Sequence, residues 1–113
     1  MAKKDVKKPV AREPAPPGDF TIKKSKAVAG LEKLADASQD LIATDPPWGI
    51  EWPGYGEFSD ELVGQEFTSW CIEWMLECRR VLKPHGTFFL AIGPEHVSEL
   101  DVAAKSMGFH KRA

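Results

Sequence analysis

The sequence has few cysteines and no long apolar run, so it has few residues that could form disulfides, bind a metal or span a membrane. It contains only two cysteines, Cys71 and Cys78, whose spacing fits neither a CxxC pair nor a zinc site. Both fall on the apolar face of an expected helix, where free cysteine acts as a small hydrophobic residue, as is usual in a reducing cytoplasm. No apolar run approaches the roughly 18 residues that span a membrane, and none follows the charged N-terminus as in a secretory signal. We therefore expect no metal site, no membrane span and a cytoplasmic location.

A glycine-rich turn between a strand and a helix, which allows backbone to approach a cofactor, is also missing. Gly54-Tyr55-Gly56 contains the only closely spaced glycine pair, and it neither follows an expected strand nor opens an expected helix. Upstream of Asp45 there is room for little more than one strand and one helix. We therefore expect no cofactor-binding glycine motif in this chain.

Charge is distributed unevenly along the 113 residues. Residues 1–26 carry eight basic and three acidic side chains, whereas residues 27–113 carry seven basic and fourteen acidic ones. Residues 1–18 are rich in Lys, Pro and Ala, which is typical of a flexible, basic, Pro-rich leader. Such a leader either contacts nucleic acid or is a solvated tail that aids solubility, and its charge alone does not separate the two.

The rest of the chain alternates between strand and helix patterns. Residues 20–22 open a short strand, and a short amphipathic helix follows over residues 28–35. Residues 40–44 form an apolar run that Pro46-Pro47 must end, and this is typical of a parallel strand buried on both faces. Residues 49–58 form a loop long enough to be functional.

The second half continues the alternation. Apolar residues from Phe67 to Leu82 recur at helical spacing, and Lys83-Pro84-His85-Gly86 is expected to end that helix. Residues 88–92 form a second apolar strand, and Gly93-Pro94-Glu95 starts a last helix that ends near Gly108. This order predicts an α/β fold with a parallel sheet and flanking helices. In such sheets ligands bind beyond the carboxyl ends of the strands, where Asp45 to Trp48 lie.

The tetrapeptide Asp45-Pro46-Pro47-Trp48 is an unusual end for a buried strand. Each proline stiffens the backbone and removes a donor, so its carbonyls are free to accept hydrogen bonds. Asp45 adds a carboxylate acceptor, and Trp48 adds a flat apolar face. These groups suit an aromatic amine, whose lone pair is delocalised into its ring. Two acceptors that hold its N–H groups would free that lone pair, and a base flipped out of a duplex needs a surface to stack on.

The sequence resembles the N4-cytosine/N6-adenine DNA methyltransferases over about residues 20–112. Their signature is an acid, Ser or Asn, then Pro-Pro and an aromatic residue, as in Asp45-Pro46-Pro47-Trp48. Three further blocks resemble the family in order and spacing. They are residues 79–88, where His85 stands at a common glycine position; residues 91–95, where Pro94 stands at a usual acid position; and residues 107–110.

By this resemblance, Asp45 and the Pro46 carbonyl hold the target amine, Pro47 stiffens the loop and Trp48 stacks on the base. The implied reaction transfers a methyl group from S-adenosylmethionine to adenine N6 or cytosine N4 in DNA, as in restriction-modification. Asp at position 45 favours adenine. Asp45 is also the candidate contact to the cofactor.

The order resembles the circularly permuted beta branch, whose glycine motif lies near the C-terminus. We therefore expect residues 19–113 to be the N-terminal part of a methylase domain with a partial, incomplete Rossmann-like fold. We expect this chain to be inactive alone, and a complementary C-terminal fragment or a homodimer is an expected partner.

Several alternatives stay open. An Asp-Pro-Pro-Trp loop also marks RNA adenine N6-methyltransferases, so the chain could belong to an enzyme that acts on RNA. A second alternative is that the chain is not an enzyme but a non-catalytic remnant that binds nucleic acid or a partner. The aromatic residues Trp52 and Tyr55 either close over the base or pack within the loop. His85, His96 and His110 are expected at the surface.

Overall fold

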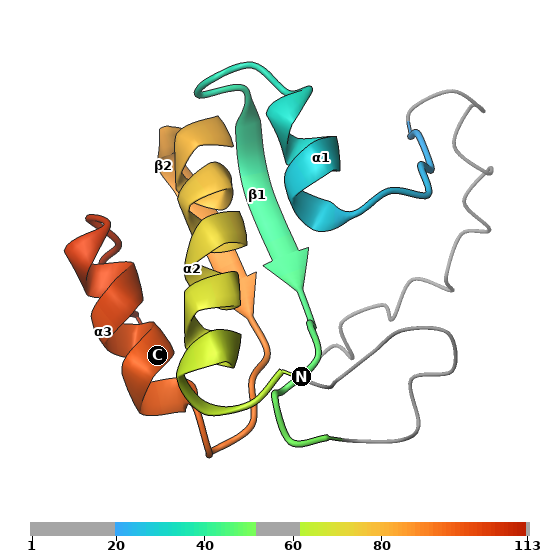
Figure 1. Cartoon of the computed structure of the whole chain (residues 1–113). Coiled ribbons are helices and arrows are strands. Elements are labelled where there is room, and N and C mark those ends of the chain that lie inside the picture. Colours follow the sequence, from blue (N-terminus) through green and yellow to red (C-terminus); the bar gives the residue numbers. More distant parts are fainter. Residues whose placement is uncertain (1–19, 52–61, 113) are drawn as a thin grey trace, which may run out of the picture.

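The computed structural model describes residues 20–51 and 62–112. The expected leader and the loop residues Trp52, Gly54, Tyr55 and Gly56 lie outside these ranges. The elements in chain order are α1 (Ala27–Glu32), β1 (Gln39–Thr44), α2 (Gly64–Val81), β2 (Leu82–Leu90) and α3 (Val97–Ser106). The expected α/β class is confirmed: a parallel pair of strands is flanked by helices, consistent with an incomplete Rossmann-like fold (Figure 1).

The expected strand at residues 20–22 is wrong, because residues 20–26 are irregular and make no ladder. In the described part of the chain the sheet is β1 paired with β2. The register runs from Leu41 opposite Thr87 to Thr44 opposite Leu90. No residue of helix α1 is fully buried, but its half-buried Val28 and Leu31 pack against the core.

Strand β2 begins earlier than its sequence suggests. The sequence predicts that Lys83 to Gly86 end the helix and that the strand covers residues 88–92, yet β2 starts at Leu82, directly after α2. The register shows the reason, since Gln39 pairs with Leu82 but Leu41 pairs with Thr87, which leaves a bulge between them. Pro84 lies in this bulge, so its missing N–H removes no regular ladder bond. Glycine is required at position 86, where a Cβ would lie 2.8 Å from the Leu82 side chain.

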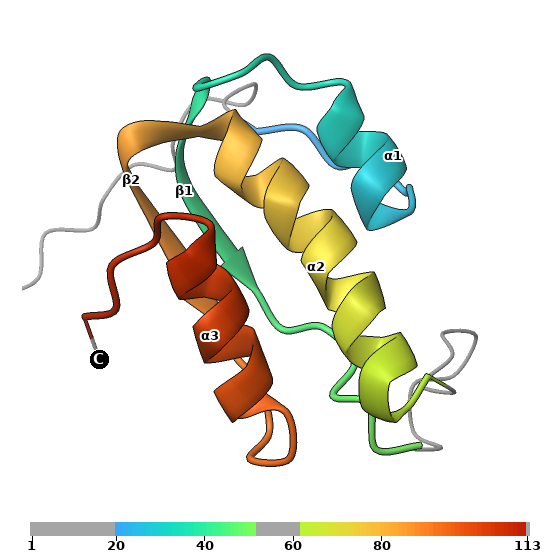
Figure 2. The ribbon, with the colours of Figure 1, turned by 60° about the vertical axis from the view of Figure 1, so that its left-hand side comes forward.

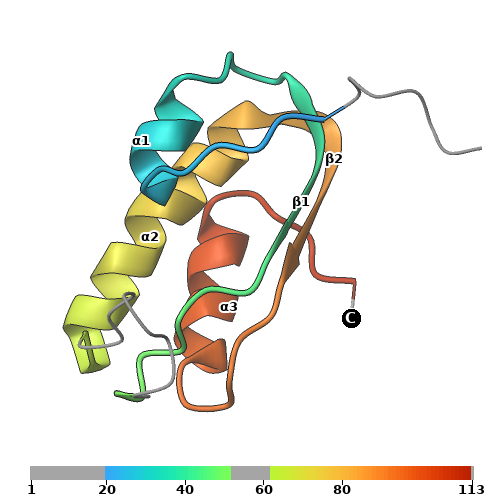
Figure 3. The same cartoon turned by 90° about the vertical axis from the view of Figure 1, so that its right-hand side faces the viewer.

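All three helices lie on one face of the sheet (Figures 2 and 3). Ile42, Phe88 and Leu90 point to that face and pack against the core. On the other face, Leu41 is 55% and Phe89 is 61% exposed. The expectation of strands buried on both faces is therefore wrong for the described residues, because no described helix covers the second face.

Helix α2 supplies most of the core. Its buried residues recur at helical spacing and are Phe67, Cys71, Trp74, Met75, Cys78 and Val81. Leu100 and Ala103 from α3 are also buried. The expected burial of both cysteines is confirmed, and neither forms a disulfide. Burial raises the pKa of Cys71 to about 12 and that of Cys78 to about 11.

Arg80 at the end of α2 fastens the segment that contains α1. Its guanidinium donates to the carbonyls of Leu31 and Leu34 at 2.8 and 2.9 Å. It also bonds the carboxylates of Asp36 at 2.6 Å and Glu77 at 2.7 Å. These two carboxylates raise the pKa of Arg80, with Asp36 the larger cause. The planar fork of arginine makes this set of bonds possible, since lysine offers a single point charge.

Candidate active site

The tetrapeptide lies where the two parallel strands end. Thr44, the last residue of β1, pairs with Leu90, the last residue of β2. One more bond follows, from the amide of Ala91 to the carbonyl of Thr44 at 3.0 Å. The chain segments after both strands therefore leave the sheet side by side. This is the sheet edge at which the alternation of strands and helices predicts a ligand site.

Within the tetrapeptide, the acid and the aromatic residue are joined. The indole Nε1–H of Trp48 donates to Oδ1 of Asp45 at 3.1 Å. Asp45 is exposed, whereas Pro46, Pro47 and Trp48 are half-buried. An ionised carboxylate has about four acceptor positions, so the indole uses only a part of its capacity. The loop therefore presents an acceptor and part of an aromatic ring at one place on the surface.

A glycine from the other strand supports the Trp48 ring. A Cβ on Gly93 would lie 2.6 Å from Cε3 of Trp48 and 3.2 Å from Cδ2. Carbon atoms in contact are normally about 3.5–4.0 Å apart, so only glycine allows the ring to rest this close to the backbone. Gly93 follows β2 and is buried. Trp48 is thus held between its own loop and the turn that leads to α3.

The residue after Trp48 is fixed by α2 and by a histidine. Gly49 is buried with φ +72°, and a Cβ there would lie 2.5 Å from Cγ of Phe67. The ring of Phe67 packs against that of His96 with centroids 4.7 Å apart. Nε2 of His96 lies 3.4 Å from the Gly49 carbonyl. The expected surface placement of His96 is wrong: it is 8% exposed, because it fills the space between Phe67 and the loop.

The other candidate side chains do not join this site. His85 and His110 are exposed, as expected. Cys71 and Cys78 belong to the core of α2. Among residues 20–51 and 62–112, no three His, Cys, Asp or Glu side chains are grouped in a way that would hold a metal ion. In the same part of the chain, no helix has the length and apolar character to cross a membrane.

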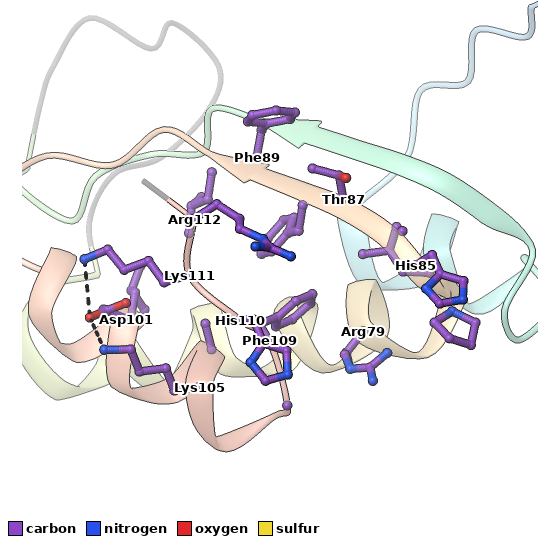
Figure 4. Close-up of a pocket in the computed structure, with 18 of the residues that line it drawn as sticks. Arg79, His85, Thr87, Phe89, Asp101, Lys105, Phe109, His110, Lys111 and Arg112 are labelled. Carbon is purple, nitrogen blue, oxygen red and sulfur yellow. Dashed lines mark hydrogen bonds and ion pairs between the residues drawn. The ribbon is translucent and has the colours of Figure 1, made fainter.

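A separate groove of about 990 Å³ runs along β2 towards α3 and the segment that follows it (Figure 4). Its apolar lining includes Phe88, Leu90 and Leu100, and its rim is rich in cations. Lys105 and Lys111 share the carboxylate of Asp101 at 3.1 and 3.6 Å, and the Lys105 hydrogen bond is the larger cause that lowers the Asp101 pKa. None of Asp45 to Trp48 lines the groove.

Comparison of the sequence with known proteins places the chain in a family. Residues 39–112 match the DNA methylase family of N6 and N4 methyltransferases. The chain is 40% identical over 74 residues to the type II methyltransferase M.HpaI of Haemophilus parainfluenzae, covering 66% of this chain and 23% of that protein. It is 32% identical over 91 residues to the DNA adenine methyltransferase YhdJ of Escherichia coli K12, covering 77% and 29%. It is 36% identical over 64 residues to the type II methyltransferase M.BglII of Bacillus subtilis, covering 56% and 16%.

The chain thus spans less than a third of the length of each of these relatives. The matched region nevertheless contains β1, the Asp45–Trp48 loop, α2, β2 and α3. Every residue that the structure places around Trp48 lies inside it, including Phe67, Gly93 and His96. The chain belongs to the N6/N4 DNA methylase family.

Proposed function

We propose that this chain carries the part of a DNA amino-methyltransferase site that holds the target base. Asp45 and the Pro46 carbonyl accept the two hydrogens of an exocyclic amine, adenine N6 or cytosine N4. Trp48 stacks on the base, and Pro47 keeps the loop stiff. The observation that carries the proposal is the exposed Asp45 carboxylate, bonded to the Trp48 indole at 3.1 Å, at the carboxyl end of β1.

The chemistry of the amine explains why these groups stand together. An aromatic amine is a poor nucleophile while its lone pair is shared with the ring. Two acceptors on its N–H groups favour a tetrahedral nitrogen whose lone pair points away from the ring. As the nitrogen gains a new bond it becomes positively charged, and the neighbouring carboxylate stabilises that charge without having to reorganise. A stacked base is worth about 1–3 kcal/mol in comparable sites, which offsets part of the cost of flipping it from the duplex.

The methyl donor of this family is generally S-adenosylmethionine, and Asp45 is the candidate contact to it in this chain. The glycines at the carboxyl ends of the strands are Gly49 and Gly93. Their missing side chains leave space that Phe67 and Trp48 already fill, so the backbone is not open to a ligand. We therefore assign to this chain mainly the steps that concern the base, with Asp45 as its one candidate contact to the donor.

A chimeric enzyme tests the proposal. Residues 39–112 of this chain replace the matching segment of M.HpaI, and transfer of a labelled methyl group is measured on matched DNA and RNA. We expect transfer to DNA, and digestion of the product identifies N6-methyladenine or N4-methylcytosine. Asp45→Ala in the chimera should lower kcat by at least about 100-fold, which is typical for loss of one preorganised polar group, with unchanged circular dichroism. Near-normal turnover by that variant, or transfer to RNA alone, contradicts the proposal.

A second proposal concerns the uncovered sheet face, which exposes Leu41 and Phe89, and the groove beside β2. Two strands with one open face gain stability from further sheet or helix layers. We propose that another methylase segment or a second copy of this chain covers them. Sedimentation equilibrium of the chain should show concentration-dependent association. Leu41→Glu with Phe89→Glu should abolish it. Val102→Glu, on an exposed site of α3, is the matched control and should not. A monomer at every concentration, without and with a methylase C-terminal segment, contradicts this proposal.

A further inference from the structure

His96 is the buried polar side chain that the proposed chemistry does not use. It is 8% exposed, and among the described residues it is the one polar or charged residue that is buried. Buried polar groups are nearly always paired, because an unpaired one loses its bonds to water. His96 precedes α3, but its side chain makes no capping bond to that helix. Its partner must therefore be sought on another element.

The contacts of His96 converge on the residue that follows Trp48. Nε2 lies 3.4 Å from the Gly49 carbonyl oxygen, somewhat longer than the usual N–H···O hydrogen bond of about 2.7–3.2 Å. One side of the imidazole packs on Phe67, and Phe67 also fills the space beside the Gly49 Cα. Gly49 is held at φ +72°, a conformation that sets the direction in which the loop leaves Trp48. Two neighbours therefore confine one peptide unit of the candidate active site.

We propose that His96 is a positioning residue for the base-binding loop. Its Nε2–H donates to the Gly49 carbonyl, and this bond, with the Phe67 packing, holds the Trp48 indole within reach of Asp45. The inference rests on the proposed function, because Trp48 and Asp45 matter only if they hold a base. It adds a residue next to the start of α3 to a site formed by the loop after β1, Phe67 of α2 and the turn after β2.

Two substitutions separate a hydrogen-bond donor from a simple filler of space. His96→Gln keeps an N–H donor near the position of Nε2 but removes the ring. His96→Phe keeps an aromatic ring against Phe67 but removes the donor. If His96 only fills the core, Phe is the better replacement. If it positions Gly49, Gln is the better replacement for the geometry of Trp48.

The test is nitrogen–proton NMR on the full 113-residue chain. The Trp48 Nε1–H signal is assigned by its loss in Trp48→Phe. We expect His96→Gln to leave the Trp48 Nε1–H and Gly49 amide signals near their original positions, and His96→Phe to shift both. Unshifted signals in His96→Phe overturn the proposal. If either variant does not fold, the ring nitrogens of His96 in the unmodified chain decide: a protonated Nε2 supports the proposal, and an unprotonated Nε2 overturns it.

The same variants in the M.HpaI chimera distinguish this inference from the proposed function. We expect His96→Phe to lower kcat by about 10-fold to 100-fold, since small misplacement of reacting groups has effects of this size, and His96→Gln to restore most of it. Loss of activity in Asp45→Ala with full activity in His96→Phe refutes the positioning role alone. Full activity in Asp45→Ala refutes the proposed function, whatever the NMR signals of His96 show.

Discussion

Gly93→Ala is the substitution whose effect on the candidate site follows most directly from the structure. The new methyl group would lie 2.6 Å from Cε3, 3.2 Å from Cδ2 and 3.3 Å from Cζ3 of Trp48. Because carbon–carbon contacts settle at about 3.5–4.0 Å, the indole and the backbone must separate by about 1 Å. The Nε1 to Asp45 bond is already 3.1 Å long, and a shift of this size removes or redirects it.

The cost is that of an overpacked site, about 1–3 kcal/mol of unfolding free energy. In a domain of this size, each kcal/mol lowers the melting temperature by about 4–8 °C. Gly93 has no positive φ, so alanine strains the side-chain contact and not the backbone. We therefore expect a lower melting temperature together with a shifted Trp48 Nε1–H signal.

A double-mutant cycle checks the cause. With Trp48→Ala in the background, the three atoms nearest to the new methyl group are gone, and Gly93→Ala should then cost much less. Gly30→Ala in α1 is the matched control, since its Cβ would meet only the Ser25 side chain, and the Trp48 signal should not move. An equal loss of stability from Gly93→Ala with and without the Trp48 ring would refute the reasoning.

Three further predictions rest on other parts of the molecule. Burial raises the pKa of the Cys71 and Cys78 thiols from 9.0 to about 12 and about 11, so only the unfolded chain ionises them just above pH 9. Their contribution to stability is complete below pH 9 and is lost as pH rises towards 11–12; a thermal-melt series should show this decline, and Cys71→Ala with Cys78→Ala should reduce it. Arg80→Lys should speed hydrogen exchange of the α1 amides, because lysine cannot reproduce the four hydrogen bonds that the Arg80 guanidinium makes. Unchanged exchange would show that these bonds do not hold α1 in place. Isothermal titration of the chain with S-adenosylmethionine should show no saturable heat, because Phe67 and Trp48 fill the space beside Gly49 and Gly93. Saturable binding would contradict this reasoning.

Local patterns in the sequence predict the elements but not their faces. The spacing of Phe67, Cys71 and Cys78 predicts the buried stripe of α2, and the structure confirms it. The apolar run before Pro46 predicts β1 equally well, but it does not say which faces are covered. Leu41 and Phe89 are exposed here because the described helices gather on the opposite face, and that is a property of the packing and not of either strand.

The sequence predicts the start of β2 at Phe88, six residues later than Leu82, for a different reason. Pro84 and Gly86 are ordinary turn residues, and a turn after α2 is what they predict. In the structure they form a bulge inside the strand, because β1 supplies partners on both sides of them, at Gln39 and Leu41. Those partners lie more than forty residues away in the sequence. The residues next to Pro84 in the sequence therefore do not predict that the bulge forms.

At the candidate site, too, the sequence predicts one part, the residues of the loop, but not the other, the residues that support the loop. The residues Asp45-Pro46-Pro47-Trp48 predict hydrogen-bond acceptors and an aromatic surface, because these residue types supply them, and their role with a base stays a prediction. The support of the loop is not readable there, since His96 meets the loop only through a contact 47 residues away in the chain. In the sequence, Pro94-Glu95-His96 has the composition of a surface turn. Only the structure shows that Phe67 and Gly49 lie next to His96 and bury it. The glycines were the available signal, because Gly49 and Gly93 both follow strands and both proved to be sites of close approach.

The family match extends far beyond the four residues of the loop. In the structure, Phe67 on α2 and His96 before α3 contact Gly49, and Gly93 after β2 lies against Trp48, so the shape of the loop depends on all three elements. A tetrapeptide placed on another strand end would keep the acceptor and the ring but not the contacts that aim them. The match over residues 39–112 covers the loop and its three supports as one unit. We therefore expect the Asp45 and Trp48 geometry to be retained wherever this unit folds, and to be lost first in Gly93→Ala or His96→Phe.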